Sequence, residues 1–191
     1  MLTFTRKFIG NVLVAETGNV LTNCKFYEVL DNEVRIGRFY SGDNYSFAEF
    51  QEQKIRIESK RHFFSRSEHK IFNQYTKALI GYYEIPNGRF MGDNKAKLHL
   101  ANGYTYRWKE LYDHRKVLKP GTWGLYRFDL GSEKHFISYY GRMSPNHFRN
   151  INPEQVFEGE VQSTEGTFLL PVFSGIFIME EKFRQLEQQP D

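Results

Sequence analysis

Residues 168–179 form the stretch of this chain that most limits how it can fold. Only Pro171, Ser174 and Gly175 interrupt large apolar side chains there, so at helical spacing the apolar residues lie on every side of the axis. A helix that is apolar all round has to be buried all round, and this one is too short to span a bilayer, which takes roughly 20 residues. The stretch therefore predicts a helix enclosed by a sheet that wraps around it.

A pair of short strands is the alternative structure for the same stretch. Phe, Val and Ile favour sheets, so strands at 167–173 and 176–179 stay open. Pro171 would then lie within a strand without a backbone donor, whereas it is tolerated near the start of a helix. The helical spacing also continues into the tail, where Phe183 and Leu186 extend the apolar stripe. We expect the helix.

The rest of the chain has the pattern of a β protein. Aromatic residues make up 17% of the sequence, with 18 Phe and 12 Tyr, and turn dipeptides are frequent. Asn102–Gly103 between two alternating runs is the strongest hairpin signal, and we expect further turns near Gly10–Asn11 and at Asp31–Asn32. Ten or more short strands favour a barrel or a sandwich, and the terminal helix favours a barrel with something inside it. The strands are expected at 25–30, 33–40, 53–60, 62–65, 70–73, 77–85, 95–100, 104–109, 122–128, 135–140 and 156–161.

The chain is expected to form a single β-barrel domain over residues 1–191. Its length is that of one domain with a full core, and it contains no charge run or Gly/Ser-rich linker that would mark a boundary. Cys24 is the single cysteine, so the disulfide framework of small secreted proteins is absent. The first residues lack the apolar core of a signal peptide. We therefore expect a cytoplasmic protein without a transmembrane segment.

Positive charge is concentrated in the middle of the sequence. Residues 54–119 hold 15 Lys and Arg against 6 Asp and Glu, a net charge of +9, although the whole chain carries only +3. Alternation puts Lys54, Arg56 and Lys60 on one face of a strand, and Lys95, Lys97 and Arg107 are expected on the outer faces of adjacent strands. Such a surface attracts anions, so these six residues are the predicted anion-binding site. The competing interpretation is an ordinary solvated exterior, where Lys also protects sheet edges.

The sequence shows no pattern typical of catalysis or of a bound cofactor. The six His residues form no metal-binding pair, and we interpret them as surface or edge residues. Ser174–Gly175 lies in an apolar run where a serine would lack a base, so we expect it to serve close packing against the sheet. We predict no catalytic residue, no metal and no cofactor.

The pattern as a whole resembles the tubby C-terminal-like superfamily, which includes tubby proteins, phospholipid scramblases and LURP-one-related proteins. The likeness covers residues 25–183 and is carried by antiparallel hairpins that end in the apolar helix at 168–179. Residues 72–77 and 97–108 are similar to the strand, turn and aromatic strand of the LURP-one-related and scramblase repeats. The resemblance implies a closed barrel of about twelve strands around a central helix. It carries over no functional residue, because the phosphoinositide-binding signature of tubby proteins is not matched.

These observations favour a non-enzymatic binding or scaffold module that contacts anionic lipid or a protein partner through its basic outer face. The alternative is a small-molecule carrier or an enzyme with a cavity inside the barrel. A helix that already fills the barrel argues against that alternative, whereas a polar cavity with a close histidine and carboxylate would favour it. We rank nucleic acid below both, and the sequence does not indicate an oligomeric state.

Overall fold

The computed structural model describes residues 2–14, 18–43, 45–50, 53–61, 67–86, 96–110, 124–131, 136–143, 157–163 and 169–187. These residues form twelve strands and one helix, α1. The elements in chain order are β1 (Leu2–Val14), β2 (Asn19–Asp31), β3 (Val34–Ser41), β4 (Tyr45–Phe50), β5 (Gln53–Lys60), β6 (Ser67–Asn73), β7 (Leu79–Ile85), β8 (Lys97–Leu100), β9 (Thr105–Glu110), β10 (Gly124–Gly131), β11 (Phe136–Met143), β12 (Phe157–Ser163) and α1 (Leu169–Glu187).

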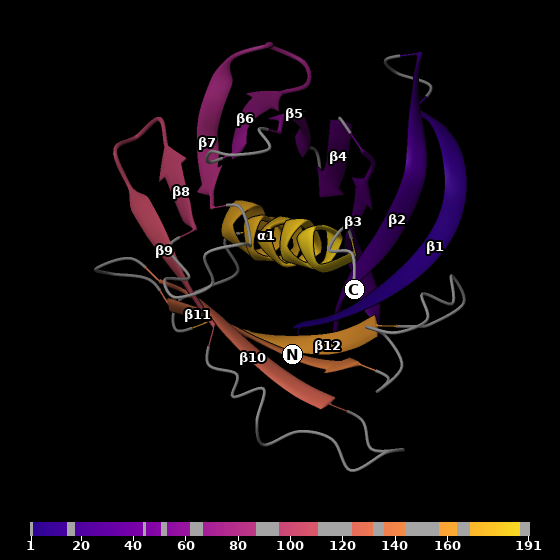
Figure 1. The fold of residues 1–191 in the computed structure, drawn as a ribbon, viewed down its shortest axis with the longest axis vertical. Coiled ribbons are helices and arrows are strands. Elements are labelled where there is room, and N and C mark those ends of the chain that lie inside the picture. The colour runs from indigo at the N-terminus through magenta and orange to yellow at the C-terminus, as the bar shows by residue number, and fades with distance from the viewer. Residues whose placement is uncertain are drawn as a thin grey trace.

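The strands close into an antiparallel barrel in which each strand pairs with its neighbours in the sequence. The last strand, β12, pairs with the first, β1, with Leu2 opposite Val161, so the sheet has no free edge among the described strands. Figure 1 shows this closed wall with α1 inside it. The prediction of a closed antiparallel barrel of about twelve strands around a central hydrophobic helix is confirmed.

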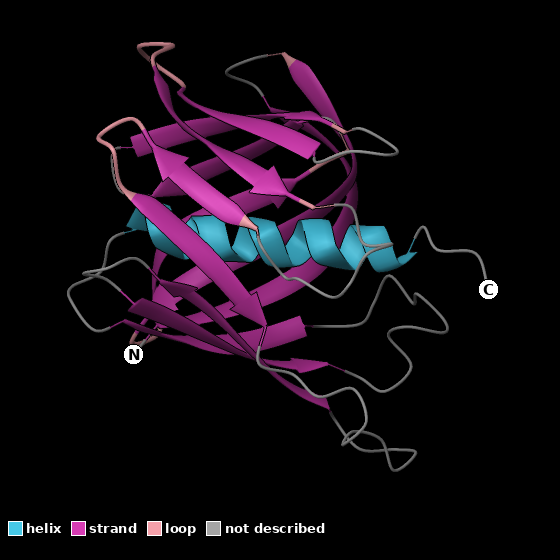
Figure 2. Cartoon of the chain, turned by 60° about the vertical axis from the view of Figure 1, so that its left-hand side comes forward, coloured by secondary structure: helices cyan, strands magenta, loops and turns pink. Residues whose placement is uncertain are grey.

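Helix α1 fills the interior because twelve strands enclose more space than their own side chains occupy. Barrels of about eight strands are filled by inward side chains alone, and larger ones leave room. Every side chain from residue 171 to residue 181 is buried, and Figure 2 shows the helix running through the barrel. Phe173 and Phe177 lie among aromatic side chains of the wall, with Phe50 stacked on Phe173 at 5.1 Å and Phe39 edge-on to Phe177 at 6.2 Å.

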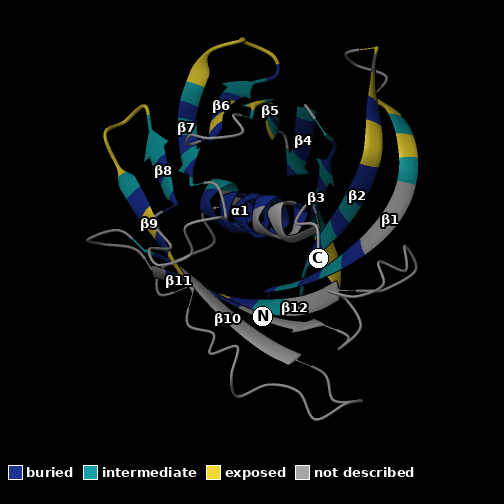
Figure 3. Cartoon of the chain, in the orientation of Figure 1, coloured by how far each residue is buried: buried dark blue, intermediate teal, exposed yellow. Residues whose placement is uncertain are grey.

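Where burial is described, most strands alternate between side chains buried against the helix and side chains that are half-buried or exposed (Figure 3). In β5, Ile55 and Ile57 are buried, whereas the residues between and around them are half-buried or exposed. In β9, Tyr106 and Trp108 are buried and Arg107 is exposed. The two-residue alternation that predicted these strands therefore arises because every second side chain faces the helix.

Two predicted turns differ from the structure. The expected hairpin near Gly10–Asn11 is wrong, because β1 continues through it and Gly10, with φ of 72°, forms a bulge in the pairing with β2. The turn between β2 and β3 lies one residue later than expected, at Asn32–Glu33, where both residues have positive φ as a type I′ turn requires. Strand β4 was not predicted, and the strand expected at 62–65 lies outside the described residues.

Candidate functional site

The second half of α1 carries charged side chains into the barrel. After the apolar run, Glu180, Glu181 and Arg184 follow at positions that face the wall, and all three are buried. Burying a charge is costly unless it is paired and hydrogen-bonded. The wall supplies these partners, and we call the resulting group the polar cluster: Arg6, Lys25, Tyr27, Ser41, Asp43, Ser59, Arg61, His69, Glu180, Glu181 and Arg184.

Glu180 lies between two cations and a tyrosine from β1 and β2. Lys25 Nζ is 3.3 Å from its Oε1 and Arg6 Nε is 3.4 Å from its Oε2, and the Tyr27 hydroxyl donates a short hydrogen bond to Oε2. Burial alone would raise the pKa of Glu180, but Arg6, Lys25 and Arg184 outweigh it and hold the pKa at about 2. Glu180 is therefore a carboxylate at neutral pH.

Glu181 binds Arg61, which follows β5, through two hydrogen bonds of 3.0 Å and 2.5 Å. Its Oε2 is also 3.9 Å from Nε2 of His69 on β6. The other ring nitrogen of His69, Nδ1, is 2.8 Å from the Ser59 hydroxyl on β5. Ser59 and His69 are directly opposite in the register of the two strands, so a serine, a histidine and a carboxylate lie in a row.

Burial dominates the chemistry of His69. It has no exposed surface and packs edge-on against Phe177 at 5.1 Å. Burial lowers the pKa of His69 to about 4, an effect that the Glu181 carboxylate opposes and the Arg61 and Arg184 cations reinforce. The imidazole is thus neutral at physiological pH. The interpretation of all six histidines as surface or edge residues is wrong for His69.

Arg184 joins the helix to the loop after β3. Its guanidinium binds the Asp43 carboxylate through a short contact and donates to the Ser41 hydroxyl at 3.1 Å. Asp43 in turn accepts a hydrogen bond of 2.9 Å from Asn23 on β2. The helix terminus, this loop and the β1–β2 hairpin are therefore linked by one chain of polar contacts.

Tyrosines of the wall hold the first half of α1. Tyr83 is 2.8 Å from the Ser174 hydroxyl, which donates to the Leu170 carbonyl at 2.7 Å. The Tyr139 hydroxyl donates to the Pro171 carbonyl at 2.8 Å. The expected packing role of Ser174–Gly175 agrees with this geometry, because a Cβ on Gly175 would lie 2.0 Å from the Tyr139 ring.

The six predicted anion-binding residues fall into separate groups. Lys54, Arg56 and Lys60 share the outer face of β5, as the alternation predicted. Lys97 on β8 and Arg107 on β9 are directly opposite each other. These two groups are three strands apart, which is about 14 Å at about 4.8 Å per strand. Lys95 lies outside the described residues.

The cations of β5 have acidic neighbours. Lys54 Nζ is 3.1 Å from Glu49 Oε1, and Arg56 Nη2 is 2.9 Å from Glu58 Oε1. Lys60 is opposite Glu68 in the register. This part of the wall thus alternates in charge, and its cations are already partly neutralised.

The cations of β8 and β9 are arranged differently. Lys97 has Glu84 opposite on one side but Arg107 on the other. Arg107 and Lys109 are exposed and lie two positions apart, so they project from the same face of β9. We call Lys97, Arg107 and Lys109 the outer cation group. Lys109 is opposite Asp129 of β10 in the register, so the two cations that face each other directly are Lys97 and Arg107. Like charges opposite each other destabilise a sheet, so an anion bound beside this pair is favourable.

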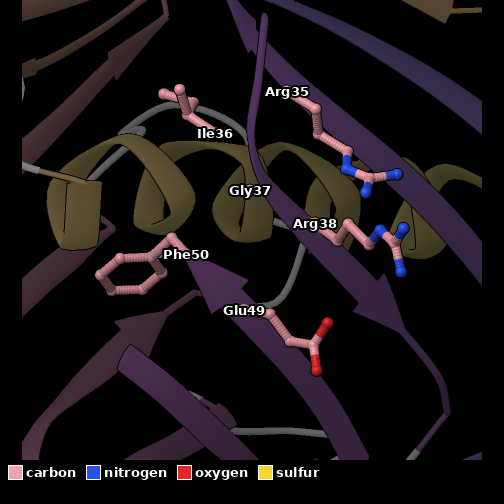
Figure 4. A pocket seen from close by; sticks show the side chains of 6 residues that line it. All are labelled: Arg35, Ile36, Gly37, Arg38, Glu49 and Phe50. Atoms are coloured by element: carbon pink, nitrogen blue, oxygen red, sulfur yellow. The ribbon is translucent and has the colours of Figure 1, made fainter. Parts of the chain in front are cut away.

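A hollow of about 430 Å³ lies beside Gly37. In Figure 4 its arginines, Arg35 and Arg38, point away from its apolar residues, Ile36 and Phe50. Of the charged lining residues, Arg35 is 3.7 Å from Glu28 and Glu49 is paired with Lys54. The hollow therefore has a charged side and an apolar side, and two of its three charged residues are paired.

The described residues support neither a metal site nor a reactive cysteine. No group of three His, Cys, Asp or Glu side chains is placed to hold a metal ion there. Burial raises the pKa of the Cys24 thiol to about 12, so it is not a thiolate nucleophile at neutral pH. Among the described residues, no helix has both the length and the apolar character needed to cross a membrane.

Comparison of the chain with protein-family models, with curated proteins and with solved structures gives no match. The resemblance to the tubby C-terminal-like superfamily therefore stays a prediction, and the geometry described above is the basis for any functional assignment.

Sequence reasoning missed the polar cluster entirely. Tyr27 and Glu180 are 153 positions apart, and Arg61 and Glu181 are 120 apart, so no local spacing reveals the pairs. One signal was available: Glu180, Glu181 and Arg184 directly follow a helix that must be buried on all sides, and a rigid helix carries the residues that follow into the same environment.

Proposed function

We propose that this protein is a non-enzymatic, cytoplasmic binding or scaffold module that docks on an anionic lipid surface through the outer cation group, Lys97, Arg107 and Lys109. The observation that carries the proposal is the direct opposition of Lys97 and Arg107 on the outside of the barrel. Two opposed cations on neighbouring strands repel each other in the free protein, and a bound phosphate group relieves that repulsion.

The occupied interior supports an outer binding surface. The side chains of residues 171–181 are buried inside the barrel, so the helix takes the volume that a carrier would offer to a ligand. The outer wall is then the larger surface available to a partner. Clusters of Lys and Arg at a surface are attracted to anionic headgroups, with about 1 kcal/mol for each cation.

Sedimentation with vesicles tests this proposal. We expect the protein to sediment with vesicles that contain phosphatidylserine at low salt and to be released as salt rises. Lys97→Glu with Arg107→Glu removes two cations and is expected to weaken binding by about 30-fold, which corresponds to about 2 kcal/mol. Neutral phosphatidylcholine vesicles should not retain the protein.

Lys54→Glu with Arg56→Glu is the matched control, because it changes the net charge by the same amount. These cations already contact Glu49 and Glu58, so we expect a smaller loss of vesicle binding. Equal losses of vesicle binding in both double variants would mean that binding depends on the net charge of the protein and not on the outer cation group. Absence of sedimentation at low salt would overturn the proposal, and binding to a single-stranded oligonucleotide that vesicles do not displace would favour nucleic acid instead.

A further inference from the structure

The row formed by Ser59, His69 and Glu181 contains the hydroxyl–imidazole contact of an activated serine. The carboxylate lies beyond hydrogen-bond distance of Nε2, which has no hydrogen-bond partner among the described residues. Nucleophilic hydroxyls are activated by a base within hydrogen-bond reach, and that base is oriented by a third group. Here the hydroxyl is 2.8 Å from Nδ1 of the imidazole, and the carboxylate is 3.9 Å from Nε2. The three residues come from β5, β6 and α1, so the closed barrel brings them together.

The carboxylate determines which ring nitrogen accepts a proton. An acidic neighbour at Nε2 favours the tautomer with the hydrogen on that nitrogen, which leaves Nδ1 of His69 as the acceptor. The Ser59 hydroxyl then donates to Nδ1, as a serine must when histidine is its general base. Burial keeps His69 neutral, so this acceptor is available at physiological pH.

The three residues differ in exposure, and the one that a substrate would have to reach, Ser59, is the most accessible. His69 and Glu181 are buried, whereas Ser59 is half-buried. Arg61 follows Ser59 by two positions and holds its guanidinium on Glu181. A permanent positive charge therefore lies at the end of β5, where it is paired with the Glu181 carboxylate.

From this arrangement we propose that Ser59 is a nucleophile that cleaves small carboxylic esters, with His69 as its general base and Glu181 as a positioning residue. Ser59 Oγ bonds to the ester carbon while its proton passes to Nδ1 of His69. The bond to the alkoxy group then breaks, and the leaving alkoxide takes that proton. Water repeats the sequence, and the acid is released with Ser59 restored.

This activity uses different residues from the lipid-docking role, on the inner side of the wall. It conflicts with the non-enzymatic part of the proposed function, so an adduct on Ser59 would overturn that part and leave the docking surface untouched. It also supplies part of the observation that would favour an enzyme, namely a histidine close to a carboxylate within the barrel. The two proposals fail independently, since vesicle binding does not require Ser59 and ester cleavage does not require the outer cation group.

Covalent labelling with an alkyl fluorophosphonate tests the proposal directly. Its phosphorus bonds to the serine oxygen as fluoride leaves with the proton, and mass spectrometry of the digested full-length protein identifies the modified residue. We expect one adduct, on Ser59, and none in Ser59→Ala. Ser46→Ala is the matched control, because Ser46 is a buried serine on the adjacent strand whose hydroxyl has no hydrogen-bond partner among the described residues.

His69→Gln should slow the labelling by at least about a hundredfold, the lower range for general base catalysis. Glu181→Gln should slow it less and extend the reactive pH range downward, because loss of the carboxylate lowers the pKa of His69 further. A role in folding alone would not shift the pH profile. Thermal unfolding of each variant checks that it is folded.

The pH profile gives a second measurement on the unmodified protein. The groups that face His69 are Glu181 and Arg184 from α1, Arg61 after β5, and Tyr83 opposite it on β7. We expect the labelling rate to stay level from pH 8 to pH 5, whereas an ordinary histidine would lose activity near pH 6.5. No adduct on Ser59, an adduct on another serine alone, or an unchanged rate in His69→Gln would each overturn the proposal.

Discussion

At the scale of single residues, the unusual feature is a carboxylate with no exposed surface held by two cations. Glu180 contacts Arg6, Lys25 and Tyr27, all of them buried. Such groups contribute less net stability than their Coulomb energy suggests, since desolvation opposes it. Their effect is asymmetric, because removing one charge leaves the opposite charges buried without that counter-charge. We infer that Glu180 fixes the position of α1 along the barrel.

Glu180→Gln is therefore expected to lower the free energy of unfolding by about 3–5 kcal/mol, the range for a broken buried ion pair. The amide keeps the size of the side chain but leaves Arg6 and Lys25 without their carboxylate. Urea denaturation at pH 7 measures the change. Glu58→Gln is the control, because Glu58 is exposed and its pair with Arg56 should contribute no more than about 1 kcal/mol. Equal effects in the two variants would contradict the inference.

At the scale of elements, α1 and β11 pack closely against each other at Gly175. Gly175 faces the Tyr139 ring, and that hydroxyl binds the carbonyls of Pro171 and Val172 at 2.8 Å and 3.1 Å. A side chain at position 175 would displace the ring and break both hydrogen bonds. Gly175 is thus required by packing, although glycine lowers helix propensity.

The sign of the stability change in Gly175→Ala shows whether helix propensity or packing against Tyr139 has the larger effect. Helix propensity alone favours alanine by about 1 kcal/mol. The added methyl group would lie 2.0 Å from a buried ring, and overpacking of this kind costs about 1–3 kcal/mol, so we expect a net loss of stability. Thermal and urea unfolding measure it. A variant more stable than the natural chain would show that the wall yields easily at this point.

The elements also show how far the sequence alone reaches. The all-round apolar stretch predicted α1, and alternation predicted β5 and β9, because each pattern reports the period with which a side chain meets the core. Gly10 looked like a turn but forms a bulge, since a glycine with positive φ serves either structure. The strand number came from the family resemblance. The polar cluster depends on contacts between distant residues and could not be read from local spacing.

At the scale of the whole molecule, the closed barrel makes the inner wall and the outer wall chemically different. Outside, cations and carboxylates alternate across β2 to β5 through Glu28, Arg38, Glu49 and Lys54, where water screens them. Inside, the charges meet in the polar cluster, where screening is weak. Changes in pH are therefore expected to act on folding chiefly through the interior, by way of His69 and Glu180.

The stability of the whole protein should fall in mild acid because of His69. Its pKa is about 4 in the folded protein and 6.5 when unperturbed, so between these values the unfolded chain binds a proton that the folded protein does not. The free energy of unfolding then decreases as pH falls from 6.5 to 4, by about 3 kcal/mol in total. Glu180, with a folded pKa of about 2 against 4.5, extends the decrease below pH 4.5.

Urea denaturation of the natural chain and of His69→Gln, each at pH 7 and at pH 5, measures how much His69 contributes to the loss of unfolding free energy. Glutamine does not titrate, so the variant should lose less stability between the two pH values. At pH 5 the histidine of the unfolded chain is protonated, because its pKa is 6.5, whereas His69 in the folded protein, with a pKa of about 4, is still mostly neutral. The difference between the two proteins in stability lost from pH 7 to pH 5 is therefore expected to reach about 2 kcal/mol. The comparison cancels every other titrating group, because these are the same in both chains. Identical pH dependence in the two proteins would mean that His69 is solvated in the folded state, and the packing of the polar cluster against Phe177 would have to be revised.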